Sequence, residues 1–485
     1  MKIKMLLVLI VFLFSIVCVS ASDVNDTLAG ADEIQVLEAN ETSQDVLSST
    51  DDGTFSSLQS KINNASSGST ITLDRDYSYD ENLKSNGIII DKDLTINGNG
   101  HKLDGKSKSR MFIILYGFMG NYRVTLNNIH FVNGYTPYDG GAILNFANLT
   151  VNKCTFTNNR AHDCGGAINS VGYLNCRNSN FNKNVAGGDG GAVFSLSFEN
   201  SFLFYHNIYV NRTIDEKLEF IITLTATANI KFLKDRVTHS TFRNNVAKGR
   251  GGGGIYAFSH INVASSTFIS NVAGEKGGAV FGNMNLYVQN SKFTGNRASM
   301  YGGAIYFKCH GSTGHYDDKG NWVSEIKFYS NSIQKSSFSK NVASKGGAIY
   351  GFRASDSDRI HCAKAVRCTF AANKVSVAGR DIYGGTASKC VFNYLKVTLK
   401  TVTVKKSAKK VVLSARLFKG KTLFKGKIIT FKFNGKTLRG KTNSQGIAKA
   451  TVTKGLLNKL TVGKNVRYQA SYGKLTAKKI VKVRK

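Results

Sequence analysis

Hydrophobic and polar residues in the middle of the chain alternate in short stretches that recur at intervals of 25 residues. In one unit, Leu149 and Val151 alternate with polar residues in a first stretch, and Cys154 and Phe156 do so in a second. Stretches this short with a period of two are typical of β-strands, and an Ala-Ile pair begins a third. The unit reads L-x-V-x-x-[SC]-x-F-x-x-N-x-A-x-x-x-G-G-A-I, which leaves no room for a helix.

Three short strands in each unit predict one rung of a right-handed parallel β-helix, an all-β solenoid whose rungs stack about 4.8 Å apart. Equivalent residues then form ladders along the solenoid axis. The interior aromatic ladder is predicted to contain Phe156, Phe181, Phe242, Phe268, Phe293 and Phe338. A ladder at one corner, where asparagine tolerates left-handed backbone and bonds to the next rung, is predicted to contain Asn159, Asn184, Asn245, Asn271, Asn296 and Asn341.

A glycine pair precedes the branched residue that opens the third strand of most units. The tetrapeptide GGAI or GGAV occupies 140–143, 165–168, 190–193, 277–280, 302–305 and 346–349. Glycine turns a corner with positive φ, alanine fits a crowded interior position, and isoleucine or valine resumes the inward face. A leucine-rich repeat has a similar period, but it needs helix formers where this chain has Gly-Gly, so it is the weaker alternative.

The regular spacing is interrupted twice, because the interval between ladder phenylalanines rises to 61 residues and then to 45. We therefore expect insertions near 195–238 and 306–328. Insertions in solenoids fall in loops on one flank, and such loops commonly build the binding face.

The second insertion contains the only tryptophan of the chain, Trp322, close to Tyr316, Asp317 and Asp318. Exposed aromatic rings with nearby carboxylates suit sugars, whose apolar faces stack on the rings while their hydroxyls bond to the acids. These four residues are the candidate glycan-binding site. The alternative is a hairpin whose tryptophan packs back on the rungs.

The two ends of the chain differ from its middle. Basic residues and an apolar run within residues 1–21 predict a cleaved signal peptide. A retained N-terminal anchor is the weaker alternative, because about 15 apolar residues are few for a membrane span, and no later segment could span one. Residues 22–52 hold nine acidic residues and no lysine or arginine, which predicts a disordered leader. The solenoid is expected over 53–395, and a second folded domain over 396–485.

The predicted second domain holds 26 lysines and arginines and no acidic residue, in a chain of net charge +34. Its alternating segments, with Asn434-Gly435 as a hairpin turn, predict about seven strands in a small Ig-like β-sandwich. Its charge either solvates the surface or attaches the protein to an anionic cell-wall polymer. Nucleic acid is a weaker candidate, because the protein is predicted to be exported and lacks an aromatic-plus-arginine motif.

The pairing of F-x-x-N with GGA[IV] over about residues 124–395 resembles the repeat of the chlamydial polymorphic outer membrane proteins. The segment 70–106 is similar to the first coil of pectate-lyase-like β-helices. The whole arrangement resembles the adhesin-like surface proteins of methanogenic archaea, in which such a β-helix precedes Ig-like domains. The resemblance implies a secreted, non-catalytic protein of the cell surface or wall that presents loops to an extracellular glycan or to a surface protein of another cell, without a cofactor.

Enzymatic activity is the competing hypothesis, because this fold also carries polysaccharide lyases and glycoside hydrolases. Such enzymes need paired carboxylates or aspartates that bind Ca²⁺. One edge of the solenoid could be lined by Asp139, Asp163 and Asp189. A simpler interpretation is that these carboxylates solvate turns. We predict no catalytic residue, and a secreted β-helix lyase or hydrolase stays the alternative.

Two cysteines, Cys368 and Cys390, each stand two residues before a phenylalanine position. Stacking in adjacent rungs would bring them within disulfide reach, or leave them as two small buried thiols. A zinc site from Cys309-His310 and His361-Cys362 is not favoured, because neighbouring residues of a strand face opposite ways. No metal site is predicted.

Overall fold

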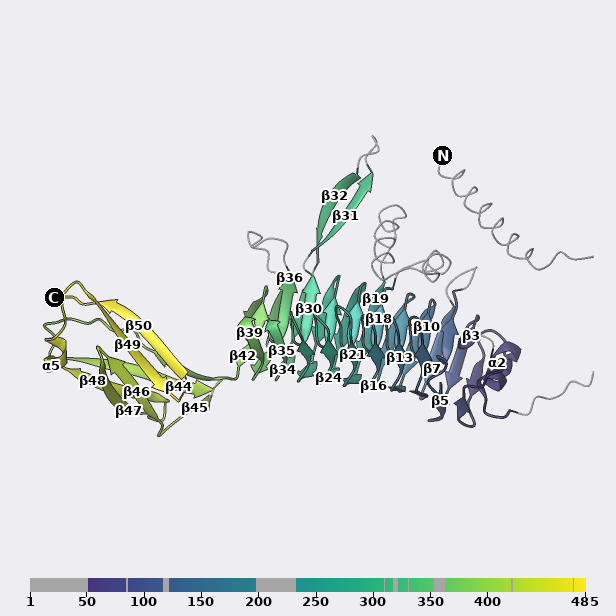
Figure 1. Cartoon of the computed structure of the whole chain (residues 1–485), viewed down its shortest axis with the longest axis horizontal. Coiled ribbons are helices and arrows are strands. Elements are labelled where there is room, and N and C mark those ends of the chain that lie inside the picture. Colours follow the sequence, from purple (N-terminus) through teal and green to yellow (C-terminus); the bar gives the residue numbers. More distant parts are fainter. Residues whose placement is uncertain are drawn as a thin grey trace, which may run out of the picture. The chain divides into compact units, whose positions relative to one another are not determined.

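The structure is a computed structural model of the 485-residue chain. It describes residues 51–83, 86–116, 122–197, 233–308, 310–316, 322–329, 331–352, 363–379, 381–419, 422–473 and 475–485. The predicted signal peptide and nearly all of the predicted acidic leader lie outside these residues. The right-handed parallel β-helix is confirmed, and Figure 1 shows its rungs following one another from α2 (Phe55–Asn64) to β42 (Val391–Phe392).

Four parallel sheets run along the solenoid, and each strand pairs with its counterpart in the next rung. Sheet I, which follows the glycine pairs, contains β3 (Ile88–Ile90), β6 (Phe112–Ile114), β10 (Ile143–Asn145), β14 (Ile168–Ser170), β18 (Val193–Ser195), β22 (Ile255–Ala257), β26 (Val280–Gly282), β30 (Ile305–Lys308), β36 (Ile349–Phe352) and β40 (Ile382–Tyr383). Sheet II, built from the L-x-V stretches, contains β1 (Thr70–Thr72), β4 (Leu94–Asn97), β7 (Arg123–Asn127), β11 (Asn148–Asn152), β15 (Leu174–Arg177), β19 (Lys234–Thr238), β23 (His260–Ala264), β27 (Leu286–Gln289), β33 (Asn331–Gln334), β37 (Ala363–Val366) and β41 (Thr386–Ser388).

The other two sheets carry the phenylalanine positions and the residues that follow the ladder asparagines. Sheet III contains β2 (Tyr77–Ser78), β5 (Lys102–Asp104), β8 (His130–Val132), β12 (Thr155–Thr157), β16 (Asn180–Asn182), β20 (Thr241–Arg243), β24 (Thr267–Ile269), β28 (Lys292–Thr294), β34 (Ser337–Ser339), β38 (Thr369–Ala371) and β42. Sheet IV contains β9 (Tyr135–Thr136), β13 (Arg160–Ala161), β17 (Val185–Ala186), β21 (Val246–Ala247), β25 (Val272–Ala273), β29 (Arg297–Ala298), β35 (Val342–Lys345) and β39 (Lys374–Ala378).

A typical rung therefore has four strands, and the expectation of three strands per rung was wrong. The additional strand belongs to sheet IV and is two residues long in most rungs, as in β13. Two residues are too few to show a period of two in the sequence. The strand forms because its neighbours in the rungs before and after pair with it in register.

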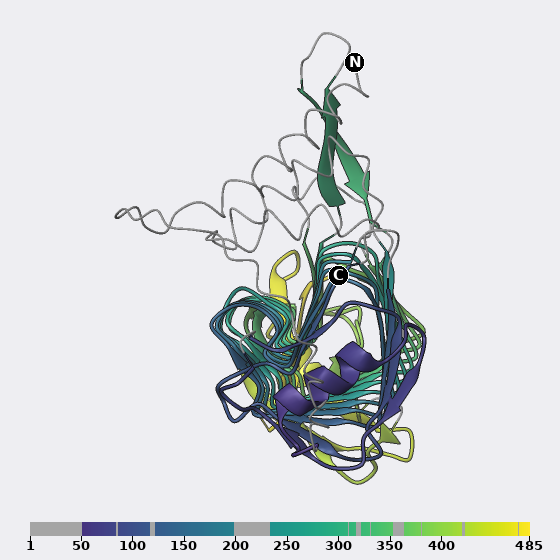
Figure 2. The same ribbon diagram turned by 90° about the vertical axis from the view of Figure 1, so that its right-hand side faces the viewer.

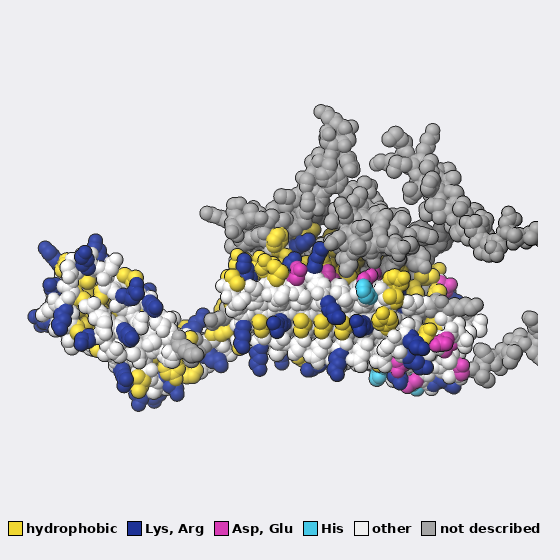
Figure 3. Space-filling view, viewed as in Figure 1, with side chains coloured by type: hydrophobic (Ala, Val, Ile, Leu, Met, Phe, Trp, Pro, Cys, Tyr) yellow, Lys and Arg dark blue, Asp and Glu magenta, His cyan; other side chains and the backbone are white. Residues whose placement is uncertain are grey.

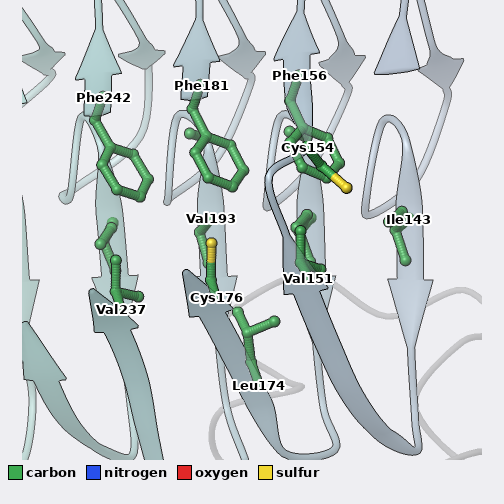
Figure 4. Close-up of a cluster of buried hydrophobic side chains, with 14 of the residues drawn as sticks. Ile143, Val151, Cys154, Phe156, Leu174, Cys176, Phe181, Val193, Val237 and Phe242 are labelled. Carbon is green, nitrogen blue, oxygen red and sulfur yellow. The ribbon is translucent and has the colours of Figure 1, made fainter. Parts of the chain in front are cut away.

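The six predicted phenylalanines form one interior column, with Phe131 before them and Phe370 after them. Successive rings from Phe131 to Phe338 are 4.6–4.9 Å apart and nearly parallel. Figure 4 shows three of them, Phe156, Phe181 and Phe242, in adjacent rungs. The ring separation equals the spacing of strands in a sheet, so each ring packs on the next without a gap.

The six ladder asparagines are fully buried, and each amide bonds along the axis. Asn271 Nδ2, for example, donates to Asn296 Oδ1 at 3.0 Å and to the carbonyl oxygen of Phe242 at 2.9 Å. The ladder ends where Asn373 Nδ2 donates to Asp381 Oδ1 at 3.0 Å. At its other end, the N–H of Gly134 donates to Asn159 Oδ1 at 2.8 Å.

The backbone conformation expected for these asparagines was wrong. The left-handed residue is the one before each ladder asparagine, such as Asn158 with φ 57° or Ser270 with φ 54°. The turn therefore places the asparagine side chain inside the solenoid, where water cannot compete for its amide, instead of using asparagine for its tolerance of left-handed backbone.

The two glycines of each pair are needed for different reasons. The first has a φ between 62° and 71° in all seven rungs that carry it, including Gly277. The second is crowded, because a Cβ atom on Gly278 would lie 2.2 Å from the carbonyl oxygen of Gly303 in the next rung. Only a residue without a side chain allows the rungs to approach this closely.

Helix α2 covers the N-terminal end of the solenoid, as Figure 2 shows, and was not predicted. It buries Phe55, Leu58 and Ile62. The side chain of Thr54 accepts the N–H of Ser57, and the side chain of Ser57 accepts the N–H of Thr54, which is a capping box. This helix shields the edge of the first rung, as terminal caps do in other solenoids.

The C-terminal strands form two antiparallel sheets around one core, which fits the expected Ig-like sandwich. One sheet contains β43 (Leu395–Leu399), β44 (Lys410–Lys419), β45 (Thr422–Leu423) and β48 (Ile447–Thr453), and the other contains β47 (Lys436–Lys441), β46 (Ile428–Phe433), β49 (Asn465–Tyr472) and β50 (Leu475–Lys482). A short helix, α5 (Lys454–Leu457), follows β48. Phe431, Phe433 and Tyr468 are fully buried between the sheets. Asn434 and Gly435, both with positive φ, form the predicted turn.

None of the helices that the structure describes is both long and apolar enough to cross a membrane.

Candidate functional site

Two of the four corners of the solenoid keep one length from β7 onward. Two residues connect sheet II to sheet III, and two connect sheet III to sheet IV. Each corner has one left-handed residue, such as Lys153 at the first and Asn158 at the second. The asparagine ladder occupies the second corner, so a change of length there would break the ladder. These corners are therefore fixed by the fold itself.

The corner between sheets I and II behaves differently. It is two or three residues long in most rungs, as between β22 and β23. It is much longer at four places, after β6, β18, β30 and β36. The chain leaves the solenoid at the same corner each time, so these connections share one side, which we call the insertion flank. Figure 1 shows the hairpin that leaves from the end of β30.

That hairpin consists of β31 (His310–Tyr316) and β32 (Trp322–Phe328), paired antiparallel. Tyr316 and Trp322 are Cα partners and form the last pair before the turn. Asp317 and Asp318, the other two residues of the predicted glycan site, lie outside the described residues. The two aromatic residues of that prediction are therefore adjacent in the hairpin, at its far end from the solenoid.

The first insertion is closed at its base by an acidic side chain. In a rung without an insertion, the N–H of Leu149 donates to the carbonyl oxygen of Tyr173 at 2.9 Å. In the rung before the insertion, the equivalent N–H of Leu174 donates instead to Asp235 Oδ1, also at 2.9 Å. Asp235 stands at the inward position that Leu149 and Leu174 occupy in their rungs, and it is fully buried.

The carboxylate of Asp235 has two further donors. The hydroxyl of Ser197 donates to it at 2.6 Å, and that of Ser195 also donates to it. The N–H of Leu233 donates to the carbonyl oxygen of Ser197 at 3.0 Å, which joins the two ends of the insertion. Burial nevertheless raises the pKa of Asp235 to about 6, because the charged form loses its hydration.

The second insertion is closed by an amide in the equivalent place. Asn331 Oδ1 accepts the N–H of Leu286 at 2.9 Å, and Asn331 Nδ2 donates to the carbonyl oxygen of Lys308 at 3.0 Å. Both insertions thus replace a lost main-chain acceptor with the side chain of the first inward residue after them. The sequence signal is a single Asp or Asn where the repeat has an aliphatic residue, which is too little to predict the closure.

A second aromatic column lies on the outer face of sheet I, beside the insertion flank. Its rings, 4.4–5.6 Å apart, belong to Phe194, Tyr256, Phe281, Tyr306, Tyr350 and Tyr383. Lys276 Nζ lies 5.9 Å from the centroid of the Tyr306 ring. Burial and the nearby charges of Lys276 and Arg250 lower the pKa of Lys308. The flank is therefore bordered by stacked rings and positive charge.

Two of the three candidate catalytic carboxylates accept main-chain hydrogen bonds in turns. Asp139 Oδ1 accepts the N–H of Cys164 at 2.8 Å, and Asp189 Oδ1 accepts the N–H of Gly251 at 2.7 Å. Both side chains are buried, and burial raises the pKa of Asp189 to about 6. Asp163 lies beside the exposed ring of His162. Among the described residues no group of three or more histidines, cysteines or acids is placed to hold a metal ion.

Cys368 and Cys390 lie in adjacent rungs, and both thiols are free. The N–H of Cys368 donates to Cys390 Sγ at 3.4 Å. Both lie at the corner between sheets II and III, each directly before a strand of sheet III, as unpaired thiols. Of the residues considered for zinc, His310 begins β31, and Cys309, His361 and Cys362 lie outside the described residues.

Residues 153–171, 290–308 and 335–351 match the family described as the Chlamydia polymorphic membrane protein (Chlamydia_PMP) repeat. No curated protein and no solved structure matches the chain. Each matched segment runs from the corner before sheet III, through the phenylalanine and asparagine ladders, to the glycine pair and the start of sheet I. In these rungs the chain is similar to the polymorphic membrane protein repeat, and the similarity lies in the residues that build the ladders.

Proposed function

We propose that this is an exported, surface-exposed, adhesin-like protein that binds its partners through the insertion flank. The observation that carries the proposal is that large changes of length are confined to one corner of the solenoid. A scaffold that keeps two corners at a fixed length while one flank carries long insertions is typical of proteins whose loops carry recognition. The similarity to a repeat of membrane proteins supports a location at the surface.

The ligand of the flank is an extracellular glycan or a surface protein of another cell. Tyr316 and Trp322 support the glycan, because they are paired at the end of the β31–β32 hairpin, and aromatic rings stack on sugars. The basic sandwich attaches the protein to an anionic wall polymer. Its 26 basic residues without one acidic residue support this attachment, since solubility alone needs a smaller excess of charge.

The test removes the hairpin and leaves the solenoid intact. Residues 309–330 are replaced by Phe-Ser, the two-residue connection between β22 and β23, and Asn331 is changed to Leu as in a rung without an insertion. We expect this variant to melt like the wild type and to lose binding to fixed cells and to an immobilised glycan panel. Trp322→Ala is the milder variant. Unchanged binding by both variants would refute the role of the hairpin.

The alternative, a secreted β-helix enzyme, is tested by incubating the wild-type protein with acidic polysaccharides. Release of reducing or unsaturated sugar ends would indicate a secreted β-helix hydrolase or lyase and would contradict a purely adhesive role.

A further inference from the structure

A shallow hollow of about 380 Å³ lies at the corner between sheets II and III in the last three rungs. Its polar lining consists of Gln334, Lys335, Lys364, Arg367, Ser388 and Lys389. The four basic side chains are exposed, and no acidic residue lines the hollow. We infer that this hollow binds a linear, negatively charged polysaccharide. The inference goes beyond the proposed function, since it uses neither the hairpin nor the sandwich.

Three of the cations form a row along the solenoid axis. Lys335, Arg367 and Lys389 occupy the same corner position in consecutive rungs, which are about 4.8 Å apart. Hydrogen bonds fix this register, because the N–H of Lys335 donates to the carbonyl oxygen of Val366 and that of Arg367 to Ser388, both at 2.9 Å. A row of fixed positive charges matches a polymer that carries repeated carboxylate or sulfate groups.

The corner itself does not favour these residues. Lys335, Arg367 and Lys389 have φ values of 47°, 54° and 53°, in the left-handed region that asparagine tolerates best among residues with a side chain. Asn128 and Asn290 occupy the same position in earlier rungs, with φ 50° in each. Like charges in neighbouring strands also repel one another. The earlier rungs also place Lys153, His239 and Ser265 here, each beside uncharged or differently charged neighbours, so one lysine is tolerated. Three consecutive cations occur in the last rungs alone among the described ones, and this run points to a ligand.

The described residues of the surrounding rungs do not neutralise the row. Among the described residues from 331 to 395, Asp381 is the only acidic one, and its buried carboxylate accepts the amide of Asn373. Figure 3 shows, on the face it presents, that acidic side chains gather toward the N-terminal rungs of the solenoid. The positive field at the hollow is therefore available to a ligand from solution.

The lining favours a polysaccharide over a nucleic acid. No aromatic ring lines the hollow, so it lacks the stacking platform on which proteins bind single-stranded nucleic acids. The amide of Gln334 and the hydroxyl of Ser388 can both donate and accept, which suits sugar hydroxyls.

The test measures lysine acetylation by mass spectrometry on the full-length protein, because a local readout is not obscured by the basic sandwich. The probes are polygalacturonate, dextran sulfate, neutral dextran and single-stranded DNA. We expect polygalacturonate or dextran sulfate to slow acetylation of Lys335, Lys364 and Lys389 about fivefold or more. Lys153 and Lys183, with φ 55° and 56°, have asparagines at the equivalent positions of the adjacent rungs and should stay unprotected. Protection by one polyanion and not the other identifies the carboxylate or the sulfate as the recognised group.

The matched variants change three lysines or arginines to asparagine at left-handed positions. The site variant is Lys335→Asn, Arg367→Asn and Lys389→Asn, and the control is Lys153→Asn, Lys183→Asn and Lys340→Asn. Both should melt at or above the wild-type temperature, but only the site variant should lose the protection of Lys364. Uniform protection across all lysines, no protection, or stronger protection by DNA would overturn the inference. The variant without the hairpin should keep the protection, so this test and that of the proposed function can fail separately.

Discussion

Single residues decide where the solenoid can turn. The second glycine of each pair cannot be replaced by a residue with a side chain because the neighbouring rung is too close, as the 2.2 Å approach at Gly278 shows. The first glycine is required because its backbone has a left-handed φ angle. Both limits explain why the sequence repeats Gly-Gly and not one glycine.

We expect Gly278→Val to destabilise the protein by about 3 kcal/mol or more, since the side chain overlaps main-chain atoms that cannot move without breaking a rung. Lys276→Val, two residues earlier, should stay within about 1 kcal/mol. Lys276 forms isolated β-bridges with Gly251 and Tyr301, and valine keeps that main-chain pairing. Thermal melting of the two variants is the measurement, and equal melting temperatures would contradict the crowding argument.

Asp235 should make stability depend on pH. Its pKa is about 6 in the folded protein against 3.8 ordinarily, so the folded state binds more protons in this range. The free energy of unfolding therefore falls as pH rises from about 4 to about 6. Asp235→Asn keeps the acceptor for Leu174 and removes the charge, so it should stabilise the protein by about 3 kcal/mol at pH 7 and have little effect at pH 4.

The other insertion supplies the matched control, because Asn331 holds the equivalent position. Asn331→Asp should destabilise the protein at pH 7 and be nearly neutral at pH 4. Urea unfolding at the two pH values measures both variants. If the difference in unfolding free energy between each variant and the wild type does not change with pH, the charge at these positions does not affect stability.

Strands of two to five residues are stable in this solenoid only because their ladders continue through neighbouring rungs. The phenylalanine column is the clearest case. Phe268→Ala should destabilise the protein by about 3–5 kcal/mol, as in other cores. Amide exchange should also accelerate in the rungs of Phe242 and Phe293, which pack against it. Thr267→Ala, on the outward side of β24, is the control, and an equal loss in both variants would contradict the column.

The elements that repeat could be predicted from the sequence, because each rung needs the same residues at the same crowded positions. Phe268 and Gly278 recur in kind in most rungs, so the period reveals them. Helix α2 occurs once and has no repeat to reveal it, and its capping box uses Ser57 where the usual sequence signal is Glu or Gln. Asp235 could not be recognised, because its role depends on which carbonyl the insertion removes from the neighbouring rung.

At the scale of the whole molecule, charge is divided unevenly along the chain. The sandwich carries 26 basic residues, and the full-length protein should pellet with cell-wall material at low salt. It should be released as ionic strength approaches 0.5 M, where the Debye length is roughly 4 Å.

Charge reversal separates the sandwich from the solenoid in that assay. The sandwich variant changes four exposed lysines to glutamate: Lys405, Lys406, Lys409 and Lys410. The control reverses four exposed lysines of the solenoid: Lys183, Lys248, Lys292 and Lys340. The sandwich variant should weaken retention more than the solenoid variant. Neither should change the free energy of unfolding by more than about 1 kcal/mol. If retention changes with neither ionic strength nor charge reversal, the basic residues of the sandwich serve solubility alone.

The asparagine ladder gives the solenoid a direction. Each amide in it donates one N–H to the asparagine of the next, C-terminal rung and the other to a phenylalanine carbonyl of the preceding rung. The bonds between asparagines all run the same way, so they polarise one another, much as peptide groups do in an α-helix. The positive end of this column meets the carboxylate of Asp381, and the negative end meets the N–H of Gly134. A rung added beyond Asp381 would face a charge instead of an amide, whereas a rung inserted between two existing ones finds a donor on one side and an acceptor on the other. The solenoid can therefore grow from within while both of its ends stay as they are.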